Sequence, residues 1–411
     1  GHTVEDFTFD ALGRLTQAKD NDSIVEFTYD SLGRVLTEKQ GSNPFGSTAK
    51  TVSYTYDDAG NVTLLDYPAG FEAHRTFDAI DRLTAIEDAS SSAIADFAMY
   101  GAGRRMKTLE FGNGTKSAWT WDGFRRPTAI NHLDSTPTQF AGFEYAWDKN
   151  DNPLYEERSH QSGKGDVYSY DRANRLVTVL QDVDDPANEV ANPGTEVYVD
   201  KVQYNMDEVL NFTSLVITPY GGGASTVNFT TNGMNEYTAV GGTTHVYDDN
   251  GNLVDDGVND YVYDWRNHLI EVIDQSSSTT IAEYAYDCFG LGRRFEKVVG
   301  SDTTRFVYAD QQCIEEYDGS GTLLRTFVFG AGIDEIVMME APDVADVDSD
   351  TNTTELKRFY YHRQLIGSVT HITDPDENVV ESYDYGPYGE IEIFDQSSST
   401  VSASQIGTPF T

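Results

Sequence analysis

Cysteine, basic residues and long apolar runs are all scarce in this chain of 411 residues, and each scarcity excludes a class of protein. With only two cysteines, neither a disulfide-dense scaffold nor a four-cysteine zinc site can form. The 68 acidic residues outnumber the 28 basic ones, and the resulting formal charge of −40 argues against nucleic acid as a partner. No apolar run reaches the roughly 18 residues that span a bilayer, so we expect no transmembrane segment.

Two further absences concern the ends and the helices. No charged-then-apolar signal segment opens the chain, which starts at Gly1, and we therefore expect a processed fragment of a longer protein. Length alone suggests two or three domains. No long segment shows an apolar stripe with a 3.6-residue period, so the sequence predicts very little helix.

An internal repeat is the main positive feature. FTFDALGRLTQA at residues 7–18 returns as FTYDSLGRVLTE at residues 27–38. The aromatic-x-aromatic unit of this formula occurs 17 times between Phe9 and Tyr385, which gives a mean spacing of about 23.5 residues. The spacing varies in the polar stretches between units, as is typical of loops that join repeated structural units.

Each unit translates into a β-hairpin. In Phe7-Thr8-Phe9 the aromatic side chains share one face of a strand, Asp10 opens a turn, and Gly13 supplies the positive φ that a short hairpin loop needs. Most equivalents of Gly13 tolerate the left-handed region, and Arg125 is the exception. Those equivalents are Gly33, Gly60, Asp81, Asn174, Gly251, Asn267 and Gly290.

Stacked hairpins would pool their aromatic faces into one ladder, so the predicted fold class is all-β: tandem β-hairpin YD repeats that form a coiled β-strip. We expect four regions along it. They are a strip over 1–339, an acidic insertion loop over 340–357, terminal repeats over 358–395, and a Ser/Thr-rich tail or linker over 396–411. Cys288 and Cys313 lie about one repeat apart, where either a bridge or two free thiols would fit, although their different registers disfavour the bridge.

The iterated formula resembles the RHS/YD-repeat family, which includes RHS cores of bacterial polymorphic toxins, shell subunits of insecticidal toxin complexes, and teneurins. TTHVYDDNGNLVDDG at 243–257 is close to the family pattern, and residues 358–390 are similar to the segment that precedes the terminal RHS core motif. Two departures stand there: Glu377 where glycine is usual, and Gly386 where aspartate is usual. The core motif itself is absent from these residues.

The resemblance implies a hollow cocoon made from the coiled strip, which in toxins sequesters a C-terminal effector. It also implies an aspartate-based autoprotease in the terminal core, a part that this chain lacks. At roughly 4.8 Å per strand, about 34 strands give a strip on the order of 160 Å long, which we expect to make about one turn. Such a strip needs the remainder of a longer RHS chain or a capping subunit, or it self-associates through its end strands.

No catalytic pattern stands out. The eight histidines are scattered without an HExxH motif, and His362 is read as a structural residue at a strand end. Paired carboxylates arise by chance among so many acidic residues, and the aromatic rows are better explained by packing than by sugar binding. The sequence therefore predicts no enzyme.

The best candidate site is DVDSDTN, in which Asp346, Asp348, Asp350 and Asn352 alternate like the first half of a calcium loop. Thr351 replaces the turn glycine and Lys357 stands where the bidentate glutamate belongs, so a solvated acidic loop is the competing interpretation. Calcium is the only cofactor that the sequence suggests, and no catalytic or other cofactor-binding residues are predicted.

Taken together, these patterns predict a non-catalytic structural protein, extracellular or at the cell surface, that builds part of a shell around a C-terminal effector. One alternative is an adhesion module that binds glycans or surface proteins through its variable loops. Another is the subunit of an extracellular filament.

Overall fold

The computed structural model describes residues 5–42, 46, 49–100, 105–289, 292–332, 334–342 and 356–409, with the backbone alone for 98–100. Within these ranges the helical elements are η1 (Ser159–Gln161) and α1 (Pro186–Ala191), and all other regular elements are strands. The predictions of an all-β fold and of very little helix are confirmed.

The strands of the first sheet are β1 (Asp6–Phe9), β2 (Leu15–Lys19), β3 (Ser23–Tyr29), β4 (Val35–Ser42), β5 (Lys50–Tyr56), β6 (Val62–Asp66), β7 (Glu72–Phe77), β8 (Leu83–Glu87), β9 (Ala93–Tyr100), β10 (Met106–Phe111), β11 (Lys116–Trp121), β12 (Pro127–Leu133), β13 (Gln139–Trp147), β14 (Pro153–Arg158), β15 (Lys164–Tyr170), β16 (Leu176–Val183), β17 (Asp200–Met206), β18 (Phe212–Pro219), β19 (Ser225–Thr231), β20 (Tyr237–Val240) and β21 (Thr243–Thr244). Those of the second are β22 (Val246–Tyr247), β23 (Leu253–Asp255), β24 (Asn259–Tyr263), β25 (Leu269–Asp274), β26 (Thr279–Tyr286), β27 (Arg294–Val299), β28 (Asp302–Ala309), β29 (Gln312–Asp318), β30 (Leu323–Phe329), β31 (Ile336–Pro342), β32 (Leu356–Arg363), β33 (Val369–Thr373), β34 (Val379–Tyr385), β35 (Ile391–Asp395) and β36 (Thr400–Val401).

Every strand pairs antiparallel with the strand that follows it in the sequence, apart from β21 and β22. The result is a 21-stranded sheet followed by a 15-stranded sheet, and the two meet at His245. Many hairpins carry a register shift beside the last aromatic of the repeat, for example between Thr28 and Tyr29. Such bulges bend a strip of strands, and here they recur along it.

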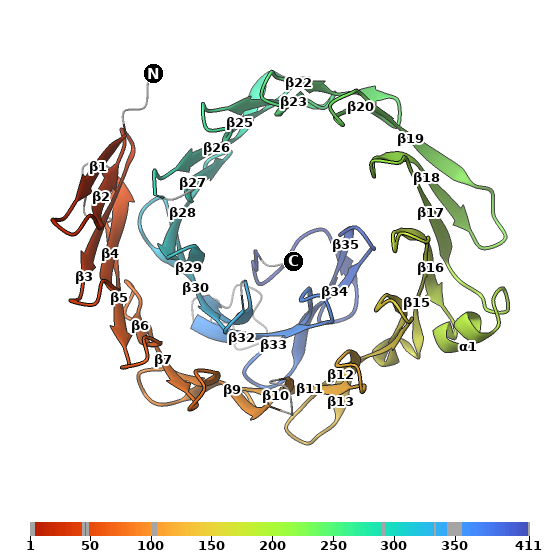
Figure 1. Ribbon diagram of the computed structural model, residues 1–411, viewed down its shortest axis with the longest axis horizontal. Coiled ribbons are helices and arrows are strands. Elements are labelled where there is room, and N and C mark those ends of the chain that lie inside the picture. The colour runs from red at the N-terminus through yellow and green to blue at the C-terminus, as the bar shows by residue number, and fades with distance from the viewer. Residues whose placement is uncertain are drawn as a thin grey trace.

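The strip coils into a spiral whose C-terminal part lies inside its N-terminal part. Figure 1 shows β28–β35 running within the curve formed by β3–β15, with the C-terminus near the centre. We call β1–β21 with its helices the outer winding, and β27–β36 with the turn that precedes β27 the inner winding. The expected single turn is therefore wrong: the strip continues past one turn because its inner winding packs against the outer one and does not extend the circumference.

The turn aspartate explains why the formula repeats. One carboxylate oxygen of Asp30 accepts from the backbone N–H groups of Leu32 at 2.8 Å and Arg34 at 2.9 Å. The other accepts from Arg34 Nε at 2.6 Å. The same arrangement recurs at Asp10, Asp78, Asp122 and Asp171. One side chain thus satisfies two loop donors and fixes the arginine four residues later.

That arginine and the repeat tyrosine join each hairpin to a neighbour. Arg14 Nη1 donates to the carbonyl oxygen of Asp30 at 2.9 Å, which is the start of the next turn. In the opposite direction, the Tyr29 hydroxyl donates to the carbonyl oxygen of Leu15 at 2.6 Å. The Arg14 guanidinium also lies 4.7 Å from the centre of the Tyr29 ring. Asp, Arg and Tyr therefore act as one unit that sets the spacing of hairpins.

Where asparagine replaces that arginine, the next turn changes with it. Asn152 Nδ2 donates to its own turn aspartate and also to Asn174 Oδ1 at 3.0 Å, and Asn211 makes the equivalent bond to Asn235 Oδ1 at 3.0 Å. Asn174 and Asn235 both occupy the positive-φ position of the following hairpin. A short amide cannot reach the next backbone carbonyl as arginine does, so the neighbouring turn supplies a side-chain oxygen.

Almost every described turn has a residue with positive φ at the equivalent of Gly13, even where that residue has a bulky side chain. Arg125 takes φ 75° and Leu210 takes φ 77°, so the turn imposes this conformation even on bulky side chains. Gly290 lies outside the described residues, and the positive φ of 87° in that longer turn belongs to Gly292.

The main core lies between the two windings. It joins Leu65, Ile86 and Phe97 of the outer winding to Phe327 and Phe359 of the inner winding, all essentially inaccessible to solvent. Along these strands the aromatic face of the strip is therefore covered by another part of the same strip. Cys288 and Cys313 are both free, as their registers favoured.

Strands extend into both the expected acidic loop and the expected tail. Residues 340–342 belong to β31 and 356–357 to β32, while the rest of the expected acidic loop lies outside the described residues. In the expected tail, 396–411, β36 pairs with β35. Farther along, Ser404 Oγ and the Ile406 N–H donate to the buried carboxylate of Glu381, so this segment packs on β34.

The turn network predicts loss of stability in acid. Backbone hydrogen bonds from Arg34 are the largest cause of the lowered pKa of Asp30, and the pKa values of Asp10, Asp78 and Asp122 are lowered similarly. A carboxylate with a depressed folded-state pKa stabilises the fold above its unfolded value of about 4, and this contribution disappears as the pH falls further. Denaturant midpoints measured between pH 5 and pH 2 should therefore fall steeply below about pH 4. Asp30→Asn should flatten that fall, whereas Asp58→Asn at an exposed site should leave its slope unchanged.

Candidate functional site: the contact between the windings

Three polar clusters cross the contact between the outer and inner windings, which we call the winding contact. They join residues far apart in the sequence, and the separation is smallest for the pair nearest the C-terminal end. Glu38 and Arg293 are 255 residues apart, Asp88 and Arg358 are 270 apart, and Gln161 and Asp384 are 223 apart. Each pair marks about one turn, so the spiral tightens toward its C-terminal end.

The first cluster is centred on Arg293, which is buried in the turn that follows β26. Its guanidinium lies 2.5 Å from Glu38 Oε1 on β4 and 2.8 Å from Asp287 Oδ2. Burial is the largest influence on both carboxyl groups and raises their pKa values, which the positive Arg293 partly offsets. The turn arginines Arg14, Arg34, Arg126 and Arg175 donate to a backbone carbonyl of the next turn of the same strip, whereas Arg293 also binds the facing winding.

Hydrogen bonds to the backbone extend this anchorage along the contact. The side-chain amide of Gln40 donates to the carbonyl oxygen of Tyr308 at 2.7 Å and accepts from the N–H of the same residue at 2.9 Å. Farther along, the buried Tyr67 hydroxyl donates to the carbonyl oxygen of Phe327 at 3.0 Å. These outer-winding side chains bind the inner strip in one register.

The second cluster surrounds Arg158 on β14. Asp166 and Asp182 lie 3.2 Å and 2.7 Å from its guanidinium, and Glu156 lies 3.7 Å away. Burial is the first cause that raises the pKa of Glu156 to about 7. Gln161 of the same region donates to Asp384 on the inner winding at 2.7 Å. A cavity of about 320 Å³ lined by Asp166, Asp182 and Asp384 lies beside this cluster.

The third cluster consists of histidines. His132 and His160 of the outer winding meet His362 and His371 of the inner winding, with ring centroids 4.9 Å to 6.4 Å apart in the measured pairs. The expectation of a structural role for His362 fits its burial, but no pattern in the sequence indicates that these four histidines meet. Residues from strands a full turn apart cannot be matched without knowing the circumference of the spiral.

The family departure at Glu377 belongs to this contact as well. Glu377 adopts φ 69°, where glycine is favoured, and its carboxylate accepts from the N–H of Ser135 on the outer winding at 2.8 Å. The gain of a bond across the windings accounts for an acidic residue at a strained turn position. At the other departure, Gly386, the turn begins without the usual aspartate carboxylate.

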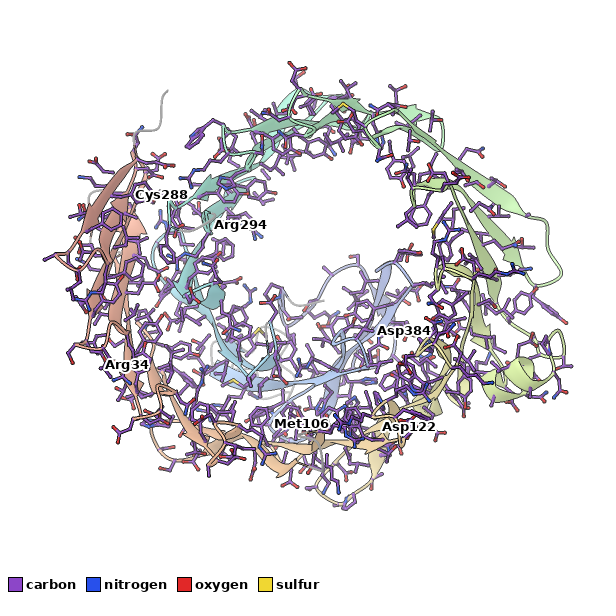
Figure 2. The ribbon with its side chains drawn as sticks, in the orientation of Figure 1. Arg34, Met106, Asp122, Cys288, Arg294 and Asp384 are labelled. Carbon is purple, nitrogen blue, oxygen red and sulfur yellow. The ribbon has the colours of Figure 1, made fainter. Side chains whose placement is uncertain are left out.

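Beyond Phe212, whose ring lies 5.3 Å from that of Tyr388 on the inner winding, one arc of the strip has no inner layer. No apolar side chain of residues 205–281 is buried, although this whole range is described. Phe27 on the aromatic face of β3 contacts Phe289 with the ring centroids 4.8 Å apart, so this face points toward the interior of the spiral. In the arc the same face carries Phe229, Tyr261 and Tyr263, which are only partly buried. Figure 2 shows side chains of this part of the strip projecting toward the open centre.

The predicted metal ligands cannot be placed. Asp346, Asp348, Asp350 and Asn352 lie outside the described residues, so the calcium prediction stays a prediction. Among the residues that are described, no group of three or more histidine, cysteine, aspartate or glutamate side chains could hold a metal ion.

Comparison with known proteins identifies the repeat. A family model described as RHS Repeat matches residues 9–48. The tRNA3(Ser)-specific nuclease WapA of Bacillus spizizenii is 27% identical over 190 residues, which cover 46% of this chain and 7% of that protein. The tRNA nuclease WapA of Bacillus subtilis strain 168 is 25% identical over 190 residues, with the same coverage. The matches thus span a small part of these relatives.

Solved structures share the fold. A structure of the Photorhabdus luminescens Tc holotoxin pore matches 94% of this chain and 21% of its own chain, with a TM-score of 0.72 and 14% identity. The crystal structure of TcdB2-TccC3-TEV matches 98% of this chain and 22% of its own, with a TM-score of 0.75 and 14% identity. The resemblance to the RHS/YD-repeat family and the predicted hairpin strip are confirmed.

Removing Arg293 should weaken the winding contact strongly. Arg293→Met would leave Glu38 and Asp287 buried without their shared cation, and such a loss costs about 3–5 kcal/mol of unfolding free energy. Arg305→Met on the neighbouring β28 removes a partly exposed pair with Glu296 and should cost about 1 kcal/mol or less. Denaturant unfolding of both variants gives the comparison, and equal losses would show that the Arg293 cluster does not anchor the windings.

Proposed function

We propose that this RHS-repeat chain is a section of a shell wall, and that the shell encloses or presents an effector carried elsewhere in a longer protein. The observation that carries the proposal is the spiral itself, in which one strip supplies both the wall and an inner layer. The uncovered aromatic face of residues 225–281 supports it, because such a face is stabilised by contact with further polypeptide. In this proposal the described residues act as a wall and not as a catalyst.

The relatives support a toxin setting. Two of them are named as tRNA nucleases, and the solved neighbours come from Tc toxin assemblies. We propose that the effector of this protein is likewise a toxic domain, for which the chain supplies the container. The remainder of a longer RHS chain, or a capping subunit, would close the open parts of the spiral.

We propose an extracellular or cell-surface location for the shell. The strongly acidic composition keeps a secreted wall soluble and disfavours nucleic acid as a partner of the wall itself. Within the described residues, no helix has the length and apolarity required to cross a membrane.

Electron cryomicroscopy of the full-length protein, beside the 411-residue chain, tests the shell. We expect closed particles in which polypeptide density lies against the inner face of β19–β26, and loss of that density in the chain alone. An arc that meets only solvent in the full-length protein would contradict enclosure. Continuous fibres would favour the filament, and retention on immobilised glycans would favour the adhesion module.

A further inference from the structure

Four of the eight histidines come together at the winding contact, two from each side. His132 lies on β12 and His160 in η1, while His362 and His371 lie on β32 and β33. Ring centroids are 5.1 Å apart between His132 and His362 and 4.9 Å apart between His160 and His371. We call these four side chains the imidazole cluster. It joins the windings through ring contacts, whereas the other two clusters join them through charges.

The surroundings of the cluster are apolar. Phe111 and Phe140 meet His362 edge-on, with centroids 4.6 Å and 5.1 Å from it, and Phe143 meets His160 at 5.1 Å. His132 and His362 have no solvent-exposed surface and His371 is 6% exposed. A positive charge placed here would lose its hydration and gain no compensating negative partner from these apolar rings.

The hydrogen bonds of the cluster suit neutral rings. His132 Nδ1 lies 2.8 Å from Ser117 Oγ, and His362 Nε2 lies 3.0 Å from Thr373 Oγ1. In a neutral ring, the nitrogen that faces the hydroxyl can carry the proton and donate it, and the other nitrogen then carries none. Within the described residues, His132 Nε2 and His371 Nδ1 have no hydrogen-bond partner at all. A protonated ring would therefore present buried N–H groups without acceptors.

Few countercharges face the cluster from the elements packed around it. The positive charge of Arg363 disfavours protonation of His132 and His362, and that of Arg158 disfavours protonation of His160. Asp384 near His160 is the acidic group that favours protonation. Burial is the largest cause that holds the pKa values of His132, His362 and His371 well below the ordinary value.

We propose that the imidazole cluster is an acid-sensitive latch: neutral rings hold β32–β33 against β12–β13, and protonation releases the inner winding from the outer wall. The proposal goes beyond the shell function, because the latch is a property of this contact whatever the shell encloses. Acidification would then open the spiral at its tightest part, where the inner winding meets η1 and β12.

Linkage gives the direction and size of the effect. A histidine whose pKa is depressed in the closed state favours closure above its ordinary value near 6.5, and this contribution is lost as the pH falls. Between pH 7.5 and pH 5.5 each such ring shifts the closed-to-open equilibrium by up to about tenfold. Three fully buried rings would together shift it by up to about a thousandfold.

Glu156 acts in the opposite direction. Its pKa of about 7 means that the closed state keeps a proton which the open state releases, so acid favours closure at this residue. Overall stability in acid would mix these opposite effects. The latch is therefore tested by local hydrogen-exchange protection at the cluster, and by the difference in that protection between variants.

Hydrogen–deuterium exchange of the 411-residue chain, corrected for intrinsic rates at pH 7.5 and pH 5.5, provides the test. We expect protection of β32–β33 and β12–β13 to fall at least tenfold on acidification, while protection of β5–β6, away from the cluster, changes far less. Unchanged protection of β32–β33 in the unmodified chain would overturn the proposal without any variant.

Variants separate the latch from general acid sensitivity. His371→Leu has similar volume, removes the unpartnered nitrogen, and should reduce the acid-induced loss of protection by about tenfold. His74→Leu, at a partly exposed ring on β7 paired with Glu72, should leave that loss unchanged. Equal acid responses in His371→Leu and the unmodified chain would assign the effect to other groups and refute the latch.

Discussion

The rest of the structure depends above all on the hydrogen bonds of the aspartate that begins most of the turns. Its two carboxylate oxygens do different work: one closes the loop by accepting from backbone donors, and the other orients the arginine that reaches the next turn. A hairpin alone has little stability in water, so the strip exists only because this link repeats. The tyrosine hydroxyl makes the return link, which fixes the distance between successive hairpins.

A strip of this kind has two faces, and coiling decides what happens to the apolar one. Along β3–β15 the aromatic face is covered by the inner winding, which completes a core of large side chains such as Tyr67, Phe97 and Phe327. Buried charges accompany this core at Arg158 and Arg293, each surrounded by more than one carboxylate. Such pairs add little net stability, but they strongly disfavour any register in which a charge is left alone. We infer that they set how far one winding slides along the other.

The two halves of the spiral differ in whether an inner layer covers the aromatic face of the strip. The double-layered half has a core between its two windings. In the single-layered half, Phe229, Tyr261 and Tyr263 remain partly exposed on the inner face. This asymmetry suits a section of a larger container, and the solved Tc structures, of which this chain matches about a fifth, have the same fold.

The sequence by itself determined the hairpin, the turn and the order of strands, because these depend on residues within about 25 positions of one another. Asp10, Gly13, Arg14 and the alternating aromatics specify a local geometry, and pairing of each strand with the next needs nothing more. Only the tertiary structure decided the number of turns and the meeting of His132 with His362 or of Glu38 with Arg293. These contacts depend on the curvature of the whole strip, which sums small bends at many bulges, and an error of one hairpin in the circumference would bring different side chains together.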